Sequence, residues 1–188
     1  MLILTIGLVV FLGVHLLPVV PAARTALRTR LGENAYKGMF SALSALGFVL
    51  MVAGYAHAPR GEQLFAPLAE ARMLAPLAMI ISFILLAAAN MKAHLRRVLK
   101  HPMLLGVGIW ATVHLLANGH LKASLLFGAF LAYALLDIVS ATLRGAGKSF
   151  EPQLKHDFIA VAGGTVTALA FMGLHRLLIG VPAVRWGW

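Results

Sequence analysis

The sequence predicts an all-α protein, a polytopic membrane bundle of about six transmembrane helices that forms one domain over residues 1–188. Two observations predict this fold class. Of the 188 residues, 61% are apolar and only 12% are charged, whereas a soluble domain is about half apolar and a quarter charged. The apolar residues also gather into six runs of roughly 20 residues, the length with which a helix crosses a bilayer. Backbone groups in lipid must be paired within the chain, which favours helices.

The six runs predict the spans in order. We expect helices over 2–20, 38–56, 73–91, 102–118, 123–141 and 158–179. Pro18 and Pro21 mark the exit from the first run, and Pro102 suits the first turn of the fourth helix. The first run lacks the basic leader and the small-residue cleavage site of a signal peptide, so we interpret it as a retained helix.

The net charge of +10 comes from basic loops. Most of the 16 Lys and Arg residues lie in the first, third and fifth loops, as Arg24, Arg28, Arg30, Lys37, Lys92, Arg96, Arg97, Lys100, Arg144, Lys148 and Lys155. The positive-inside rule then predicts a multi-pass protein of the bacterial inner (cytoplasmic) membrane with both termini outside, in the periplasm. A topology signal of this kind accounts for the charge without nucleic acid as a partner. The same loops would also attract anionic lipid in the bilayer.

His15 lies inside the first expected span, where a polar side chain is costly and tends to face the bundle interior. Gly7, Phe11 and Pro18 share its helix face. A glycine and an aromatic ring beside a buried imidazole would leave room for a flat ligand. The alternative is an imidazole that simply forms a hydrogen bond across helices.

His114 lies in the middle of the fourth expected span, on a face shared with Gly106, Trp110 and Asn118. An unpaired polar group in an apolar medium costs about 2–7 kcal/mol, so this imidazole needs a hydrogen bond, a proton or a metal. The chain has no cysteine, which excludes disulfides, thiolate ligands and covalent haem attachment. Zinc wants four ligands and calcium wants oxygens, whereas haem iron needs one or two imidazoles. Non-covalent haem and purely structural hydrogen bonding remain open alternatives.

Three further residues are candidates for roles around such a site. His101 precedes Pro102 at the cytoplasmic boundary, where it would serve a propionate or a loop carbonyl or be merely interfacial. His94 follows Asn90 at i+4 on the third expected helix, as a supporting residue or an interfacial one. Asp137 lies inside the fifth span and needs a partner. That partner is either Arg144 or the N–H of His15 or His94.

Several of these residues carry a resemblance to a known family. The pattern resembles the signature of the NnrU family over essentially the whole chain, and its residues are Phe11, His15, His101, Pro102, Gly106, Trp110, His114, Asn118, Gly119, Ser124, Phe127 and Gly128. That family is named for its link to nitric oxide and denitrification, and it is similar to the plant zeta-carotene cis–trans isomerase, a membrane haem b enzyme. The resemblance implies haem b held by His15 and His114, and a histidine matching His101 also occurs in the plant enzyme. In this hypothesis Phe11 and Trp110 line the haem site, and Asn118 or Asp137 supports a ligand. His94 or His101 is the alternative partner if His15 and His114 are too far apart along the bundle.

The resemblance leaves several functions open. The first is a haem-dependent isomerase or redox protein that acts on a lipophilic, polyene-like molecule. The second is a non-enzymatic component, such as a nitric-oxide-linked sensor or an electron-transfer subunit with a redox partner. The third is a small transporter, although no paired broken helices are evident. The plant enzyme carries a cysteine where this chain has Ala111, so a Cys/His ligand switch is impossible here.

Overall fold

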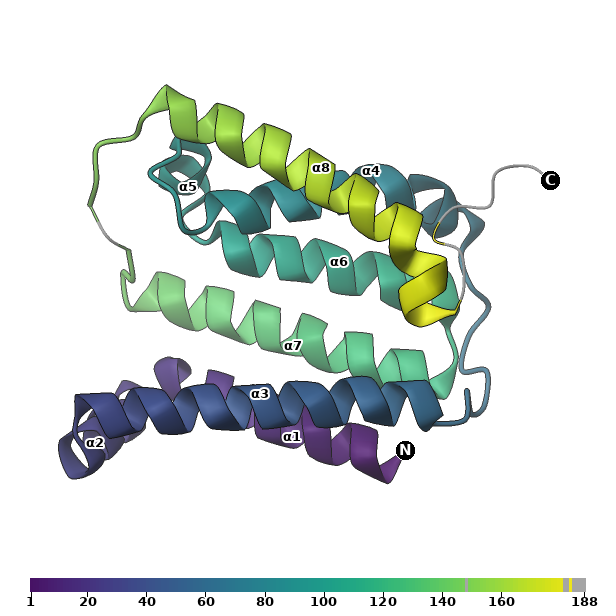
Figure 1. The fold of residues 1–188 in the computed structure, drawn as a ribbon, viewed down its shortest axis with the longest axis horizontal. Helices are drawn as coiled ribbons and strands as arrows, with labels where there is room; N and C mark the ends of the chain where they lie inside the picture. Colours follow the sequence, from purple (N-terminus) through teal and green to yellow (C-terminus); the bar gives the residue numbers. More distant parts are fainter. Residues whose placement is uncertain (148, 181–182, 184–188) are drawn as a thin grey trace.

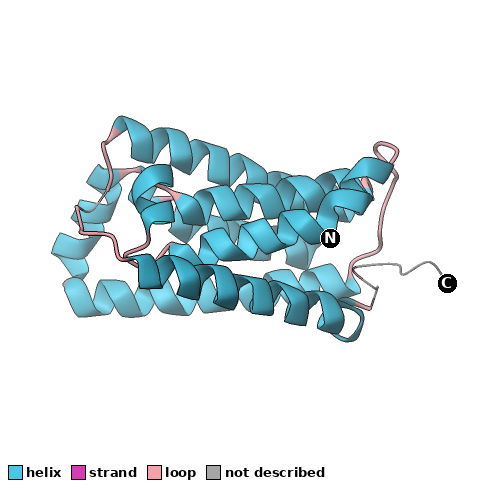
Figure 2. Cartoon of the chain, turned by 90° about the horizontal axis from the view of Figure 1, so that it is seen from above, coloured by secondary structure: helices cyan, strands magenta, loops and turns pink. Residues whose placement is uncertain are grey.

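The computed structural model describes residues 1–147, 149–180 and 183, and its regular structure is helical (Figures 1 and 2). In chain order the elements are α1 (Leu2–His15), the short 3₁₀ helix η1 (Leu17–Val19), α2 (Pro21–Leu31), α3 (Glu33–His57), α4 (Ala69–Ala88), α5 (His94–Leu99), α6 (Pro102–Asn118), α7 (Leu121–Leu143) and α8 (Leu154–Ile179).

The helices confirm the predicted fold class. Five segments are long and apolar enough to cross a membrane: Leu2–Val19, which includes η1, and the helices α3, α4, α7 and α8. α6 is an apolar helix of 17 residues. Large apolar side chains such as Phe48, Val139 and Phe158 are exposed on their outer faces, as lipid contact requires. The count of six spans and the outward direction of the termini stay predictions.

The predicted helix ends were wrong at several positions. The first span is divided, because α1 ends at His15 and Pro18 lies in the separate turn η1. The third span ends at Ala88 rather than at 91. Two short helices, α2 and α5, occupy stretches that the apolar pattern assigned to loops. Both are too polar to show as apolar runs, although Pro21, at the first position of α2, was a visible start signal in the sequence.

Glycines allow α1 and α3 to pack closely as a hairpin. A Cβ atom added at Gly47 would lie 2.6 Å from the backbone nitrogen of Phe11, and Gly7 and Gly54 meet backbone atoms of the opposite helix in the same way. Such contacts between backbones are the usual means by which small residues join membrane helices. The core of this hairpin contains Leu4 and Leu8.

The second half of the chain packs around α4, which contacts both α6 and α8, while α7 packs on α6. Ser82, which is fully buried on α4, donates a hydrogen bond of 2.8 Å to the carbonyl oxygen of Gly106 on α6. The α1–α3 hairpin meets this group through α7 (Figure 1). The rings of Phe11, Phe130, Trp110 and Phe127 contact one another at this junction.

The loops separate into two ends of the bundle. α2, α5 and the segment between α7 and α8 lie at one end, whereas the N-terminus and the loop between α3 and α4 lie at the other (Figure 1). The described basic loop residues therefore gather at one end, as the sequence predicts, while Lys148 lies outside the described residues. We call this the basic end, and its placement in the cytoplasm by the positive-inside rule stays a prediction.

Candidate functional site

His15 ends α1 among aromatic rings from three helices. Its Nδ1 lies 2.7 Å from the carbonyl oxygen of Phe11, one turn earlier. Its ring stacks on Phe11 with centroids 4.2 Å apart, lies 5.2 Å from the ring of Phe40 on α3, and meets Tyr133 of α7 edge-on at 6.3 Å. The predicted pairing of Phe11 with His15 is confirmed, and α3 and α7 add rings that the sequence alone did not assign to this site.

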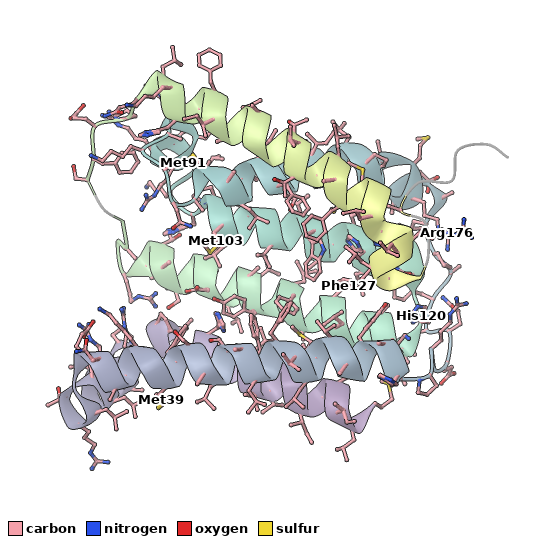
Figure 3. The ribbon with its side chains drawn as sticks, viewed as in Figure 1. Met39, Met91, Met103, His120, Phe127 and Arg176 are labelled. Carbon is pink, nitrogen blue, oxygen red and sulfur yellow. The ribbon has the colours of Figure 1, made fainter. Side chains whose placement is uncertain are left out.

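His114 repeats this local arrangement on α6. Its Nδ1 lies 2.8 Å from the carbonyl oxygen of Trp110. Its ring centroid lies 5.5 Å from that of Trp110 and 4.8 Å from that of Phe127, which lies between α6 and α7 (Figure 3). The side-chain amide of Asn118 donates a 2.7 Å hydrogen bond to the carbonyl oxygen of His114. The predicted polar stripe of Trp110, His114 and Asn118 therefore exists as one bonded row.

These hydrogen bonds fix the tautomer of both imidazoles. A carbonyl oxygen only accepts, so Nδ1 carries the proton and, in the neutral ring, Nε2 keeps a lone pair. His57 forms the same bond to Ala53 at 2.8 Å, but it is exposed at the end of α3. The bond alone is therefore a common helical feature. What distinguishes His15 and His114 is that an orientated Nε2 lies among aromatic rings inside apolar helices of the bundle.

Aromatic rings also lie between the two histidines. From His15 the contacts run through Phe11 to Phe130, with centroids 5.8 Å apart, and from Phe130 to Trp110 at 5.3 Å. α1 and α6 run in opposite directions (Figure 1). His15 therefore lies one turn from Phe11 toward the basic end, whereas His114 lies one turn from Trp110 toward the opposite end. The backbone positions of the two histidines are therefore offset along the bundle by about 12 Å at 1.5 Å per residue, and their rings by less, because each ring folds back toward the start of its own helix.

Each imidazole has the chemistry of an iron ligand, because its Nδ1 is bonded to a carbonyl oxygen and its Nε2 is left as the donor atom. For both to bind one iron, the two Nε2 atoms would have to lie about 4 Å apart, since metal–imidazole bonds are about 2 Å long. The glycines do not supply a slot, which corrects the expectation of room beside the imidazoles. A Cβ atom at Gly106 would lie 2.8 Å from the carbonyl oxygen of Ser82, and Gly7 meets the backbone of α3. These glycines serve helix packing.

Of the two alternatives for Asp137, the structure shows the Arg144 partner, and it adds Tyr133. The hydroxyl of Tyr133 donates to its Oδ2 at 3.2 Å, and a guanidinium nitrogen of Arg144 lies 3.7 Å from its Oδ1. Arg144 in turn binds Ser140 and donates to the carbonyl oxygen of Val19 at 3.0 Å, which ties α7 to η1. No bond from His15 or His94 to Asp137 is present among the described residues. Asp137 reaches the His15 site only through Tyr133.

His94 is not on the third span, so its predicted i+4 relation to Asn90 is wrong. It begins α5, where its Nδ1 lies 2.7 Å from Oδ2 of Asp157. The same carboxylate accepts the backbone N–H groups of His94, at 3.0 Å, and Leu95, at 3.1 Å. Asp157 thus caps α5 from α8. The sequence did not reveal this partner, because the two residues are far apart in the chain and no local spacing links them.

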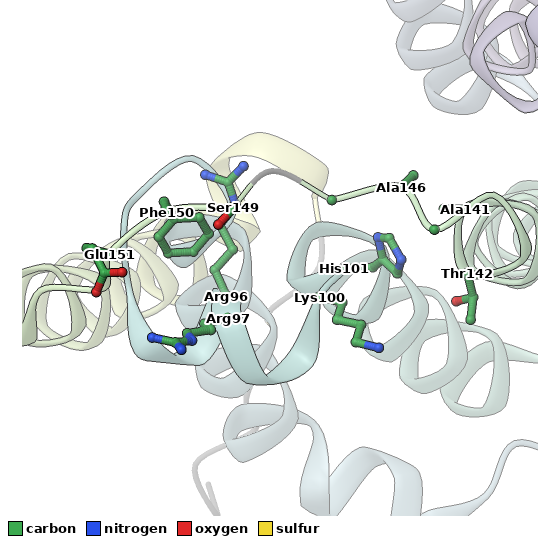
Figure 4. Close-up of a pocket in the computed structure, with 12 residues that line it drawn as sticks. Arg96, Arg97, Lys100, His101, Ala141, Thr142, Ala146, Ser149, Phe150 and Glu151 are labelled. Carbon is green, nitrogen blue, oxygen red and sulfur yellow. The ribbon is translucent and has the colours of Figure 1, made fainter.

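His101 precedes α6 as its N-cap residue and lines a hollow at the basic end, together with Arg96 and Lys100 (Figure 4). It therefore lies more than three turns from His114, and the structure does not bring it into either imidazole site. Within the described residues there is no group of three or more His, Asp or Glu side chains that could hold a metal ion. Haem differs from such sites in needing fewer protein ligands.

A family model described as NnrU protein matches residues 3–183. The chain belongs to the NnrU family. No curated protein and no solved structure matched it. In this NnrU-family chain α6 carries five of the residues that resemble the family signature, Pro102, Gly106, Trp110, His114 and Asn118. Trp110, His114 and Asn118 form the bonded row on α6, and Gly119 ends that helix with φ +69°, a left-handed conformation that favours glycine.

Proposed function

We propose that this NnrU-family protein binds haem b non-covalently inside its membrane bundle, with His114 as the residue that would hold the iron. The observation that carries the proposal is the geometry of His114. Its Nδ1–H is committed to the Trp110 carbonyl at 2.8 Å, which leaves Nε2 as the free donor atom. A backbone carbonyl that holds one ring nitrogen orientates the other toward a metal and raises its basicity. Haem is the metal group that such a lone imidazole suits best.

His114 is preferred as the first ligand because its ring and its backbone carbonyl are both held within α6, by Trp110 and Asn118, whereas His15 is the last residue of α1. The resemblance implies both histidines as ligands, and that implication stays a prediction. For both to bind one iron, the rings of Phe11 and Phe130, which contact each other between the two histidines, would have to move aside. A site with one protein ligand would let a second molecule reach the metal group.

The residues around His114 would shape that binding site. Trp110 and Phe127 offer ring faces to a flat ligand and keep water from Nε2, while Asn118 holds the carbonyl oxygen of His114 and with it the last turn of α6. Space for the ligand would come from rotation of these side chains. When bound, haem would supply a Lewis-acidic, redox-active centre in an apolar site.

An apolar, aromatic site around one imidazole supports a haem-dependent isomerase or redox protein whose substrate is lipophilic and polyene-like. The same site would also suit a second candidate, a non-enzymatic sensor of a diatomic gas such as nitric oxide. The two differ in the step after binding, since an enzyme turns its substrate over whereas a sensor only changes its ligation.

Visible spectroscopy tests the proposal. The protein is produced with haem supplied, purified in a neutral detergent, and recorded oxidised and reduced. We expect a Soret band and about one haem per chain, and a colourless preparation would refute the proposal. The reduced protein is then incubated with a cis-polyene and the isomers are separated by chromatography. Conversion identifies the enzyme, whereas binding of nitric oxide or carbon monoxide without any conversion identifies the sensor.

A further inference from the structure

The hollow at the basic end has a volume of about 360 Å³ and lies away from both imidazole sites. It is formed where α5 meets α6, beside the end of α7 and the segment after that helix (Figure 4). Arg96, Arg97, Lys100 and His101 line it, and Glu151 is the acidic residue in its lining. Its walls therefore carry an excess of positive charge.

The cations of this hollow are not neutralised within the described part of the chain. Other basic residues at the same end are paired, as Arg28 and Lys37 are with Glu33. No such ion pair holds Arg96, Arg97 or Lys100 in the described residues. Arg96 is instead steadied by the ring of Phe150, with its guanidinium carbon 5.1 Å from the ring centroid, and by the carbonyl oxygen of Met91 at 3.4 Å. Its remaining donors are free for an anion.

The position of the hollow matches the level of lipid headgroups. The apolar helix α6 begins at Pro102 and α7 ends at Leu143, and both of these ends border the hollow. The hydrocarbon layer must end where these apolar spans end, so the cations lie at the depth of the phosphates. Phe150 and Ala141 give the lining an apolar part as well. An amphiphilic ligand would contact both.

We propose that this hollow binds the phosphate headgroup of an anionic phospholipid. Guanidinium groups offer planar pairs of donors that match phosphate oxygens, and a lysine adds a mobile point charge. Basic pockets between membrane helices on the cytoplasmic side bind such headgroups in general. A zwitterionic lipid would bring its own cation into an already positive site. Free phosphate shares the recognition chemistry but lacks the acyl chains that would lie along α6 and α7.

Binding of short-chain lipids to the full-length protein in neutral detergent tests the proposal. We expect saturable binding of one dioctanoyl phosphatidylglycerol per chain, and much weaker binding of dioctanoyl phosphatidylcholine and of inorganic phosphate. The double variant Arg97→Gln/Lys100→Gln should lower the affinity by about 25-fold, since each basic side chain near an anionic headgroup contributes about fivefold. The matched control Arg24→Gln/Arg30→Gln removes the same charge from α2, outside the hollow, and should leave the affinity unchanged.

A second variant tests the shape of the site without altering its charge. Thr142→Phe would fill the hollow from α7 and should also abolish the saturable binding, so it carries the test if the double variant does not fold by circular dichroism. Equal losses in the α2 control would show diffuse surface attraction and overturn the proposal. Inorganic phosphate that binds as tightly as the lipid would overturn the assignment to a lipid headgroup, and so would equal binding of phosphatidylcholine.

Discussion

Gly47→Ala tests the close packing of the α1–α3 hairpin with a single methyl group. A Cβ atom at this position would lie 2.6 Å from the nitrogen of Phe11 and 2.9 Å from its Cα. These are backbone atoms, so no rotamer change relieves the clash. The hairpin would have to open by roughly 1 Å to restore ordinary contact distances.

The magnitude depends on two opposing terms. Overpacking of this kind costs about 1–3 kcal/mol, whereas replacing a helical glycine by alanine gains about 0.5–1 kcal/mol. Gly38 supplies the matched control, because it lies in the same helix and a Cβ atom there would have nothing within 4 Å. Gly38→Ala therefore reports the gain alone, and the difference between the two variants reports the clash. We expect Gly47→Ala to be about 1–3 kcal/mol less stable than Gly38→Ala.

Unfolding in mixed neutral detergent and dodecyl sulfate, monitored by far-ultraviolet circular dichroism, gives both free energies. The hairpin also positions Phe11, whose ring stacks on His15 at 4.2 Å, so opening it should disturb that contact. Equal free energies of unfolding for the two variants would refute the close approach of α1 to α3.

Three further perturbations probe other parts of the bundle. Ser82→Ala removes the buried hydrogen bond to Gly106 and should cost about 0.5–1.5 kcal/mol in the same unfolding assay. Asp157→Asn removes the carboxylate that bonds the backbone N–H and the ring of His94 at the start of α5, so backbone amide exchange over residues 94–99 should become faster. Burial, with Lys122 and Arg60 nearby, lowers the pKa of His120 below its usual 6.5. The folded protein therefore binds this proton less tightly than the unfolded chain. Thermal stability should decline as the pH falls below 6.5, and by less in His120→Asn.

The fold class was predictable from the sequence, because membrane helices are recognised by the length and apolar composition of their segments. The fourth expected helix, α6, even matches its expected bounds of 102–118. Contacts between residues one turn apart were also predictable wherever the expected helix is present. Trp110, His114 and Asn118 are bonded at i+4 spacing, and Asp137 meets Tyr133 and Arg144.

Contacts between helices were not predictable from one sequence. Nothing in the local spacing places Phe40 beside His15, or Asp157 beside His94. Periodicity indicates which residues share a helix face, but not which neighbouring helix that face contacts. Lipid is as apolar as the bundle interior, so apolar composition does not distinguish a face that contacts lipid from one that contacts another helix. The interpretation of Gly7 as room for a ligand failed for the same reason, because the neighbouring helix fills that space.

The central claim is that His114 holds haem with its Nε2, and one set of variants tests it most directly. His114→Ala, His15→Ala and His57→Ala each remove an imidazole whose Nδ1 is bonded to a carbonyl one turn earlier. Haem content and Soret position are measured for each after identical haem-replete expression. We predict that His114→Ala loses its haem while the other two variants retain it. Retention of haem with an unchanged Soret band in His114→Ala would contradict the claim, and loss in both His114→Ala and His15→Ala would show two imidazoles on one iron instead.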